Sequence, residues 1–331
     1  MIVQHSEGGN SLTIATERAL GVSLLDRIGN TPLLALDRLT AHLPGVQILG
    51  KVEWVNPGGS IKDRAAASIV LDAEKRGLLR FNPENNQKNA RALLDATSGN
   101  TGIAYAMLGA ALGFPVTLCV PSNVSKERKH ILAAYGADII WTDPNDGSDG
   151  AIRKARAMIA AEPDRYFYAD QYGNPQNWQA HYHTTANEIW RQTEGQITHF
   201  IAGLGTSGTF MGTTRRLKEL NPAIQCISMQ PDSPFNGFEG LKYMATAIVP
   251  PIYDATLADD NIFMQTERAY TMARELGRRD GLLVGVSAAG AVTTSLQIAE
   301  QEARAGREAV IVTVLSDSAD KYLSERFWRE G

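Results

Sequence analysis

Cysteine is scarce in this chain, since only Cys119 and Cys226 occur among its 331 residues. Both lie in apolar, strand-like runs, Val-Thr-Leu-Cys-Val-Pro and Ile-Gln-Cys-Ile-Ser-Met. Two cysteines without metal-ligand spacing argue against a zinc site, and we expect no metal. We predict that both thiols are buried packing groups rather than a disulfide or a reactive thiol.

Long hydrophobic runs and an excess of positive charge are also missing. No run of about 18 apolar residues indicates a membrane span, and the first residues lack the basic start and apolar stretch of a signal peptide. Lys and Arg number 32 against 36 Asp and Glu, which gives a net charge of −4. Binding to nucleic acid or to an anionic membrane is therefore not expected. We predict a cytoplasmic protein whose partners are small molecules.

What is present is a regular alternation of strand-like and helix-like runs. The expected strands are 46–52, 92–96, 116–120, 138–142, 199–202, 224–229 and 309–314, and the segment 28–34 leads into another. The expected helices are 23–28, 61–76, 102–112, a helix capped by Ser125 and ending near 136, 149–161, 178–192, 209–220, 266–278 and 289–305. This order predicts an α/β fold with parallel-rich sheets covered by helices on both faces.

The alternation falls into two blocks, which suggests two α/β domains with a cleft between them. Residues 1–20 are expected to form a loosely ordered arm or an exchange segment. The turn-rich segment 143–150 is expected to be a surface loop, either near the crossing between domains or elsewhere.

A first candidate loop is Asn56-Pro-Gly-Gly-Ser-Ile-Lys62-Asp-Arg, which opens a helix. A lysine in the first helical turn is unfavourable, because that end of a helix prefers anions. At a positive helix end within a cleft loop, the pKa of the Lys62 amine should be lowered. A neutral amine is what imine chemistry requires.

Two further loops gather glycine, hydroxyl and amide groups at helix starts. Thr97-Ser-Gly-Asn-Thr-Gly could cradle a carboxylate or phosphate, although an ordinary helix cap explains it equally well. Gly203-Leu-Gly-Thr-Ser-Gly-Thr209 lacks the dinucleotide and P-loop patterns and suits a compact phosphate monoester. A fourth loop around Ser287 is explained by a serine cap alone.

Taken together and in order, these segments resemble the cysteine synthase family of fold-type II pyridoxal 5′-phosphate (PLP) enzymes, a group with a tryptophan synthase β-like fold. The likeness is strongest to the B-type O-acetylserine sulfhydrylases and runs from about Leu24 to Trp328. Further segments that carry it are Ile28-Gly-Asn-Thr-Pro-Leu, Gln171-Tyr-Gly-Asn-Pro, His181-Tyr-His-Thr-Thr-Ala-Asn-Glu-Ile-Trp and Tyr322-Leu-Ser.

The resemblance implies roles for individual residues. Lys62 would form the imine with PLP and act as the acid–base group at the substrate α-carbon, and Asn100 would donate to the cofactor's 3′-oxygen. The cofactor phosphate would be bound by Gly205, Thr206, Ser207, Gly208 and Thr209, and Ser287 would meet the pyridine nitrogen. The amino-acid carboxylate would be bound by Thr97, Ser98, Asn100, Thr101 and Gln171.

The resemblance also implies a reaction and a domain division. A neutral hydroxyl at Ser287 makes the ring a weaker electron sink than a carboxylate would, which suits β-replacement. The expected reaction makes L-cysteine from O-acetylserine or O-phosphoserine and a sulfur donor, through an aminoacrylate. Residues 50–165 would form a smaller mobile domain with the carboxylate loop, and 21–49 plus 166–331 a larger one with the phosphate loop. The family is typically homodimeric.

Three segments depart from the family pattern. An Arg-Arg-Trp group is replaced by Lys242-Tyr-Met, so one positive charge remains, and Lys242 is a candidate for binding a charged substrate such as thiosulfate or O-phosphoserine. The segment Gly285-Val-Ser-Ala-Ala keeps Ser287 but loses the neighbouring hydroxyl. Asp317-Ser318 is more similar to cystathionine β-synthase. Another nucleophile, giving cystathionine or a diamino acid, and a catalytically silent regulatory homologue therefore stay open as alternatives.

Other conspicuous residues are interpreted as structural. His181 and His183 are two residues apart and should face apart on a helix, so we predict packing and surface positions rather than a metal or acid–base pair. Trp54, Trp178 and Trp190 are expected in the core or at a domain interface. The charged run Lys126-Glu-Arg-Lys-His is expected to be a solvated helix face.

Overall fold

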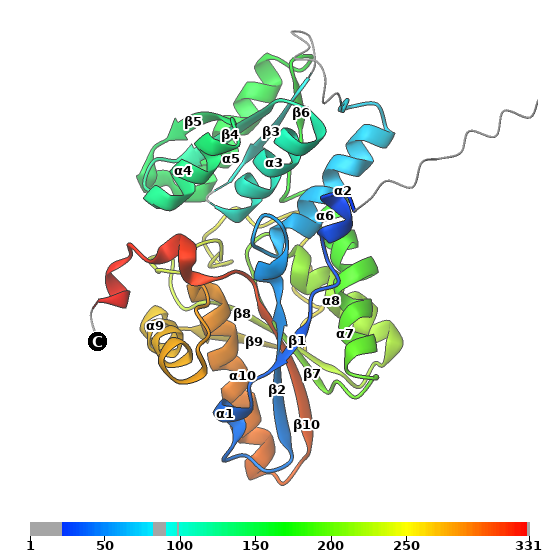
Figure 1. Ribbon diagram of the computed structural model, residues 1–331, viewed down its shortest axis with the longest axis vertical. Coiled ribbons are helices and arrows are strands. Elements are labelled where there is room, and N and C mark those ends of the chain that lie inside the picture. Colours follow the sequence, from blue (N-terminus) through cyan, green and yellow to red (C-terminus); the bar gives the residue numbers. More distant parts are fainter. Residues whose placement is uncertain (1–21, 82–90, 98, 330–331) are drawn as a thin grey trace, which may run out of the picture.

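The computed structural model describes residues 22–81, 91–97 and 99–329, so the expected arm over residues 1–20 and the candidate Ser98 lie outside the described residues. The described chain contains a six-stranded sheet in the order β1-β2-β10-β7-β8-β9 and a four-stranded sheet in the order β5-β4-β3-β6. The smaller sheet and its helices lie above the larger sheet in Figure 1. The expected α/β class with parallel-rich sheets is confirmed.

The larger sheet has helices on both faces. Its strands are β1 (Leu33–Ala35), β2 (Val46–Val52), β10 (Ala309–Leu315), β7 (His199–Gly203), β8 (Gln225–Pro231) and β9 (Asp260–Met264), and β1 and β2 are its antiparallel pair. One face carries α1 (Asp37–Thr40), α9 (Thr266–Glu275) and α10 (Val286–Arg304), and the other carries α6 (Pro175–Ala180), α7 (Ala186–Gln192) and α8 (Gly208–Leu220) (Figure 1).

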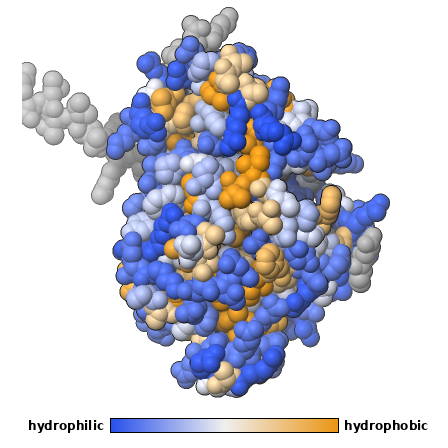
Figure 2. Space-filling model, turned by 180° about the vertical axis from the view of Figure 1, so that it is seen from behind, coloured by the Kyte–Doolittle hydropathy of each residue, from blue (hydrophilic) through white to orange (hydrophobic). Residues whose placement is uncertain are grey.

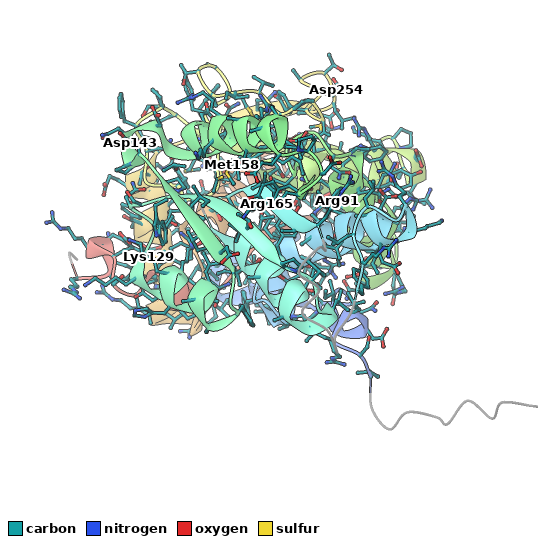
Figure 3. The ribbon with its side chains drawn as sticks, turned by 90° about the horizontal axis from the view of Figure 1, so that it is seen from above. Arg91, Lys129, Asp143, Met158, Arg165 and Asp254 are labelled. Carbon is teal, nitrogen blue, oxygen red and sulfur yellow. The ribbon has the colours of Figure 1, made fainter. Side chains whose placement is uncertain are left out.

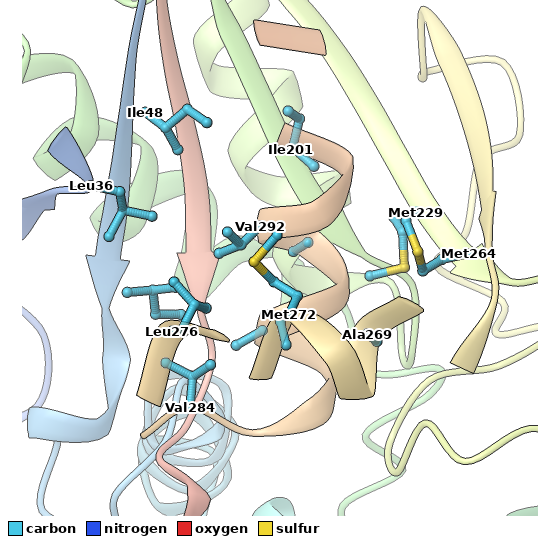
Figure 4. Packing of buried hydrophobic residues seen from close by; sticks show 14 of the residues in the cluster. Leu36, Ile48, Ile201, Met229, Met264, Ala269, Met272, Leu276, Val284 and Val292 are labelled. Carbon is cyan, nitrogen blue, oxygen red and sulfur yellow. The ribbon is translucent and has the colours of Figure 1, made fainter. Parts of the chain in front are cut away.

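Side chains of the larger sheet alternate between two cores, as a two-faced sheet requires. Ile201 points into the core on the α9–α10 side, which also contains Met272 and Val292 (Figure 4). Its neighbours Phe200 and Ala202 point to the core on the α7–α8 side. Both faces of the strand are thus buried, which explains its nearly continuous apolar sequence.

The smaller sheet is parallel throughout its described part. It consists of β5 (Asp138–Thr142), β4 (Val116–Pro121), β3 (Ala92–Ala96) and β6 (Tyr166–Tyr168). The helices α2 (Lys62–Lys75), α3 (Asn100–Leu112) and α4 (Lys126–Ala134) supply one of its cores, and α5 (Gly147–Ala161) packs on the other face. The smaller domain was predicted to end at residue 165. Strand β6 lies just after that residue, yet it pairs with β3 and so belongs to the smaller sheet. The division into two domains itself stays a prediction.

Most expected elements occur within a few residues of their expected ends, and Ser125 does cap α4, its hydroxyl accepting from the Arg128 N–H. The expected helix 178–192 is interrupted by a π-helical segment at His181–Thr185. The expected helix 266–278 ends in a π-helical segment at Leu276–Asp280. The short elements α1, β6 and β9 were not expected. The remaining turns are 3₁₀ helices at Leu25–Arg27, Glu53–Val55, Pro144–Asp146, Ala319–Tyr322 and Arg326–Trp328.

The two cysteines are buried in strands, as predicted: Cys119 lies in β4 and Cys226 in β8. Burial raises the pKa of each thiol to about 11. Trp54, Trp178 and Trp190 pack against the cores of the larger sheet, which confirms their structural interpretation.

The polarity of the surface and the character of the helices agree with the amino-acid composition. Seen from behind, the molecule is mostly hydrophilic, with hydrophobic residues gathered in a band down the middle of that face (Figure 2). Among the described residues, no helix has the length and apolar character needed to cross a membrane.

Candidate active site

A cavity opens where the carboxyl ends of β3, β7 and β10 face the starts of α2, α3, α8 and α10, the usual ligand position in parallel α/β sheets. It encloses about 850 Å³ of space, counting its open mouth. Ten of the predicted site residues line it together: Lys62, Thr97, Asn100, Thr101, Gln171, Gly205, Thr206, Ser207, Thr209 and Ser287. Gly208 adjoins them as the first residue of α8.

Lys62 is the first residue of α2 and lines the cavity. Burial lowers the pKa of its amine, while the carboxylates of Asp317 and Glu53 counteract part of that effect. The amine is therefore shifted toward the neutral, nucleophilic form that the sequence predicted.

The loop that carries Lys62 is anchored by a buried charge network. Glu53 accepts from the Asn56 side chain at 2.8 Å and from Nε of Arg64 at 2.8 Å. Arg64 also binds Glu188 at 2.7 Å, and Glu188 in turn binds Lys51 at 2.7 Å. Since Arg64 lies two residues beyond Lys62, this network fixes the start of α2.

The 97–101 loop is held by hydroxyl and amide groups. The Thr97 hydroxyl accepts from the N–H groups of Gly99 (3.1 Å) and Gly102 (3.2 Å). The Thr101 hydroxyl donates to Gln171 at 2.7 Å, and the Gln171 amide donates to the Ala96 carbonyl at 2.6 Å. Thr101 and Gln171, which are far apart in sequence, thus form one polar wall of the cavity.

The 205–209 loop has no room for larger side chains at its glycines. A Cβ atom on Gly205 would collide with the Gly240 carbonyl oxygen, and one on Gly208 would collide with the Asn177 amide. Ser207 has a positive φ of 67°, and within the described part of the chain its buried hydroxyl has no hydrogen-bond partner. The loop therefore presents free donors at the start of α8.

The Ser287 hydroxyl lies at the start of α10, 2.9 Å from the hydroxyl of Ser316. Ser316 also lines the cavity and was not among the predicted site residues. It follows directly after β10, as the other candidates follow their strands, so its position in the chain could have identified it.

Asp317 is a second residue that was not among the predicted site residues, although its segment had drawn notice as a departure from the family pattern. It is fully buried and accepts hydrogen bonds from the Asn100 amide at 2.7 Å and from the Tyr322 hydroxyl at 2.6 Å. It therefore ties the loop of Asn100 to the segment that follows β10.

Lys242 does not line the cavity. Its buried ammonium binds Asp149 of α5 at 2.6 Å and lies 5.0 Å from the ring centroid of Tyr172. The structure therefore does not bring Lys242 together with the other predicted residues, and a role in substrate binding stays a prediction.

Arg128 corrects the expectation that the run 126–130 is a solvated helix face. Its side chain is 2% exposed, lines the cavity, pairs with Glu239 and lies 4.7 Å from the ring centroid of Tyr322. The adjacent Lys129 lies at the outer surface (Figure 3), 5.2 Å from the Trp141 ring. The expectation was wrong for Arg128 because this one position of the run faces the cavity, where Glu239 and Tyr322 lie against its side chain.

The two histidines lie apart, as predicted. His181 is buried, with its ring nitrogens 2.9 Å from the Thr185 hydroxyl and 3.3 Å from the Thr209 hydroxyl, while His183 is exposed. In the described part of the chain, no three His, Cys, Asp or Glu side chains are grouped closely enough to hold a metal ion.

Residues 24–317 match the family model described as "Pyridoxal-phosphate dependent enzyme". A cysteine synthase of Aquifex aeolicus is 51% identical over 304 residues, which cover 91% of this chain and 90% of that protein. A cysteine synthase B of Salmonella typhimurium is 40% identical and covers 91% and 94% of the two chains.

Solved structures agree with these sequence relatives. A cysteine synthase of Entamoeba histolytica superposes with a TM-score of 0.85 at 33% identity, covering 100% of this chain and 95% of that one. A structure of O-ureido-L-serine synthase superposes with a TM-score of 0.84 at 33% identity, covering 94% and 96%.

Proposed function

Because the chain belongs to the family of pyridoxal-phosphate dependent enzymes, we propose that it makes L-cysteine from O-acetyl-L-serine, or O-phospho-L-serine, and a sulfur donor such as sulfide. The observation that supports this most directly is the meeting of Lys62, Asn100, Ser287 and the 205–209 loop in one cavity. They come from four separate loops, and each has the chemistry that one part of PLP requires.

The cavity fits the cofactor. The free hydroxyl of Ser207 and the tight turn at Gly205 suit a phosphate monoester at the start of α8. The Asn100 side chain has an oxygen without a partner among the described residues, while its nitrogen already contacts Asp317. One proton of that nitrogen is left to bind the 3′-oxygen.

When bound, PLP supplies an aldehyde that links to an amine and a ring that withdraws electrons from the substrate α-carbon. Lys62 is the amine we assign to that link, and it also takes the proton from the α-carbon. Its lowered pKa favours the neutral form that both roles need. Ser287 would meet the ring nitrogen as a neutral partner, which favours β-replacement over transamination.

The substrate carboxylate is assigned to the polar wall of Thr97, Thr101 and Gln171. The remaining amide proton of Gln171 and the N-terminus of α3 are donors suited to an anion, and the Thr97 and Thr101 hydroxyls hold them in place. Closure of the smaller sheet and its helices over the larger would exclude water during the reaction.

The test is turnover by the purified protein supplied with PLP. We expect L-cysteine from O-acetyl-L-serine and sulfide, and a comparison with O-phospho-L-serine and thiosulfate identifies the preferred pair. Absence of cysteine with every pair, in protein that has bound PLP, would reject the proposal.

A second candidate keeps the cofactor and changes the nucleophile. The O-ureido-L-serine synthase structure, which superposes with a TM-score of 0.84, favours it. A screen of homocysteine, hydroxyurea and amines against sulfide, each with the same activated serine, separates the two. A silent regulatory homologue would turn over none of them. Homodimer formation and a cytoplasmic location stay predictions.

Gly205→Ala should weaken PLP binding. The added methyl would collide with the Gly240 carbonyl oxygen and displace the phosphate loop. We expect affinity to fall by about 10- to 100-fold, in line with the loss of one or two hydrogen bonds to a charged group. Titration of apoprotein with PLP measures it. Gly277→Ala, whose methyl would come no closer than 3.3 Å to Leu283, is the control and should bind normally.

Thr101→Val should raise KM for the amino-acid substrate by about tenfold. The change removes the hydroxyl that binds Gln171 but leaves the groups assigned to PLP in place. Steady-state kinetics should show the effect without a change in the cofactor spectrum. Thr271→Val, on an exposed position of α9, provides the matched control. An unchanged KM would remove Thr101 from the substrate wall.

A further inference from the structure

Asp317 stands where three of the cavity loops meet. Its neighbour Ser316 accepts from the N–H of Ile61 at 2.9 Å, next to Lys62, and residues Ser60 and Asp317 form an isolated β-bridge. The Gly285 N–H donates to the Asp317 carbonyl at 3.1 Å, two residues before Ser287. The side chain reaches the third loop through Asn100.

The surroundings of the Asp317 carboxylate are closely packed. Oδ2 accepts from both Asn100 and Tyr322, and Oδ1 is buried without a hydrogen-bond partner among the described residues. A Cβ atom on Gly285 would collide with Oδ1, so the carboxylate can take this place only because glycine stands there. A buried acidic group held in this way has few alternative positions.

We propose that Asp317 is a positioning residue, whose carboxylate orients the Asn100 amide toward the cofactor and supplies the negative charge beside the Lys62 nitrogen. This inference rests on the proposed function for its catalytic meaning. It adds a residue behind the cavity wall, since Asp317 does not itself line the cavity.

Few charged side chains act on the Lys62 amine. The negative groups acting on its amine are Asp317 and Glu53, and the pKa of His181 is itself lowered by burial, Arg64 and Lys62. Glu53 is already engaged by Arg64. Around Asp317 itself the titratable groups are Tyr322, Lys321 and Lys62. Of these two carboxylates, Asp317 has the larger effect on the Lys62 amine.

The test compares Asp317→Asn with wild type by two measurements. In apoprotein, competitive acetylation over a pH series, followed by mass analysis of the Lys62 peptide, reports the titration of that amine. In holoenzyme, the pH midpoint of the cofactor absorbance reports the same nitrogen when linked. Removing a negative charge should shift both to lower pH, and kcat should fall by about 10- to 100-fold.

Two further variants separate charge from simple disruption. Asp320→Asn removes a charge from the exposed surface of the same segment and should shift neither midpoint. Tyr322→Phe keeps the Asp317 charge but removes one of its donors, so both midpoints should move to higher pH. It gives a reading even if Asp317→Asn does not fold.

Unchanged midpoints in Asp317→Asn would overturn the inference. If Asp317→Asn does not fold, unchanged midpoints in Tyr322→Phe would overturn it. An equal shift in Asp320→Asn would also overturn it. The apoprotein measurement does not require turnover. Wild-type protein without cysteine synthesis, but with an Asp317-dependent titration of Lys62, would therefore reject the proposed function and keep this inference.

Discussion

Replacing Lys62 by alanine is expected to reduce turnover by at least about 1,000-fold, because the change removes both the covalent link to PLP and the proton acceptor at the α-carbon. The yellow colour of the holoenzyme should be lost or altered with it. Borohydride reduction of wild type, followed by peptide mass mapping, should place the pyridoxyl group on the peptide that contains Lys62.

The matched control is Lys75→Ala, at the exposed far end of the same helix α2. It removes an amine of the same type and should leave colour, turnover and the labelled peptide unchanged. A pyridoxyl group found on another lysine, or a Lys62→Ala variant that keeps full activity, would remove the basis of the proposed function.

Replacing Arg64 by leucine is expected to lower the free energy of unfolding by about 3–5 kcal/mol, because it leaves the buried Glu53 carboxylate without its cation and Glu188 with Lys51 alone. The Arg64 side chain is 2% exposed and binds Glu53 and Glu188. Burial alone would raise the pKa of Glu188, but its hydrogen bonds and charge interaction with Arg64 lower it to about 2. Denaturant unfolding of the apoprotein measures the loss.

Arg76→Leu is the matched control for Arg64→Leu, because Arg76 is the residue directly after α2 and the substitution is the same. Arg76 pairs with Asp72 at 2.9 Å, but its side chain is 60% exposed, so the expected loss is below about 1 kcal/mol. Equal losses for the two variants would show that the buried network contributes no more than a surface ion pair.

The sequence was informative wherever a site residue follows a strand and opens a helix. Lys62, Asn100 and the 205–209 loop all occupy such positions, and parallel strands bring their carboxyl ends to one edge. The apolar strands β3 and β7 were predicted with nearly correct ends because burial on both faces makes their sequences continuous.

What the sequence could not supply are contacts between distant segments. The run 126–130 is charged, so nothing in it distinguishes Arg128, which is buried by Tyr322 and Glu239, from its solvated neighbours. Lys242 was assigned from its charge, yet its charge is used by Asp149. The edge strand β9, Asp-Asn-Ile-Phe-Met, is polar at its start and partly exposed, so its pattern was too weak to predict.

The burial of Cys119 and Cys226 has a consequence for an enzyme that handles sulfide and releases a thiol. Mixed disulfides form when a thiolate meets an accessible sulfur, and both cysteines are fully enclosed with the pKa of each thiol near 11. Since the chain has no other cysteine, cystine and polysulfides find no partner on the folded protein. The folded protein is therefore protected from forming mixed disulfides with its own product.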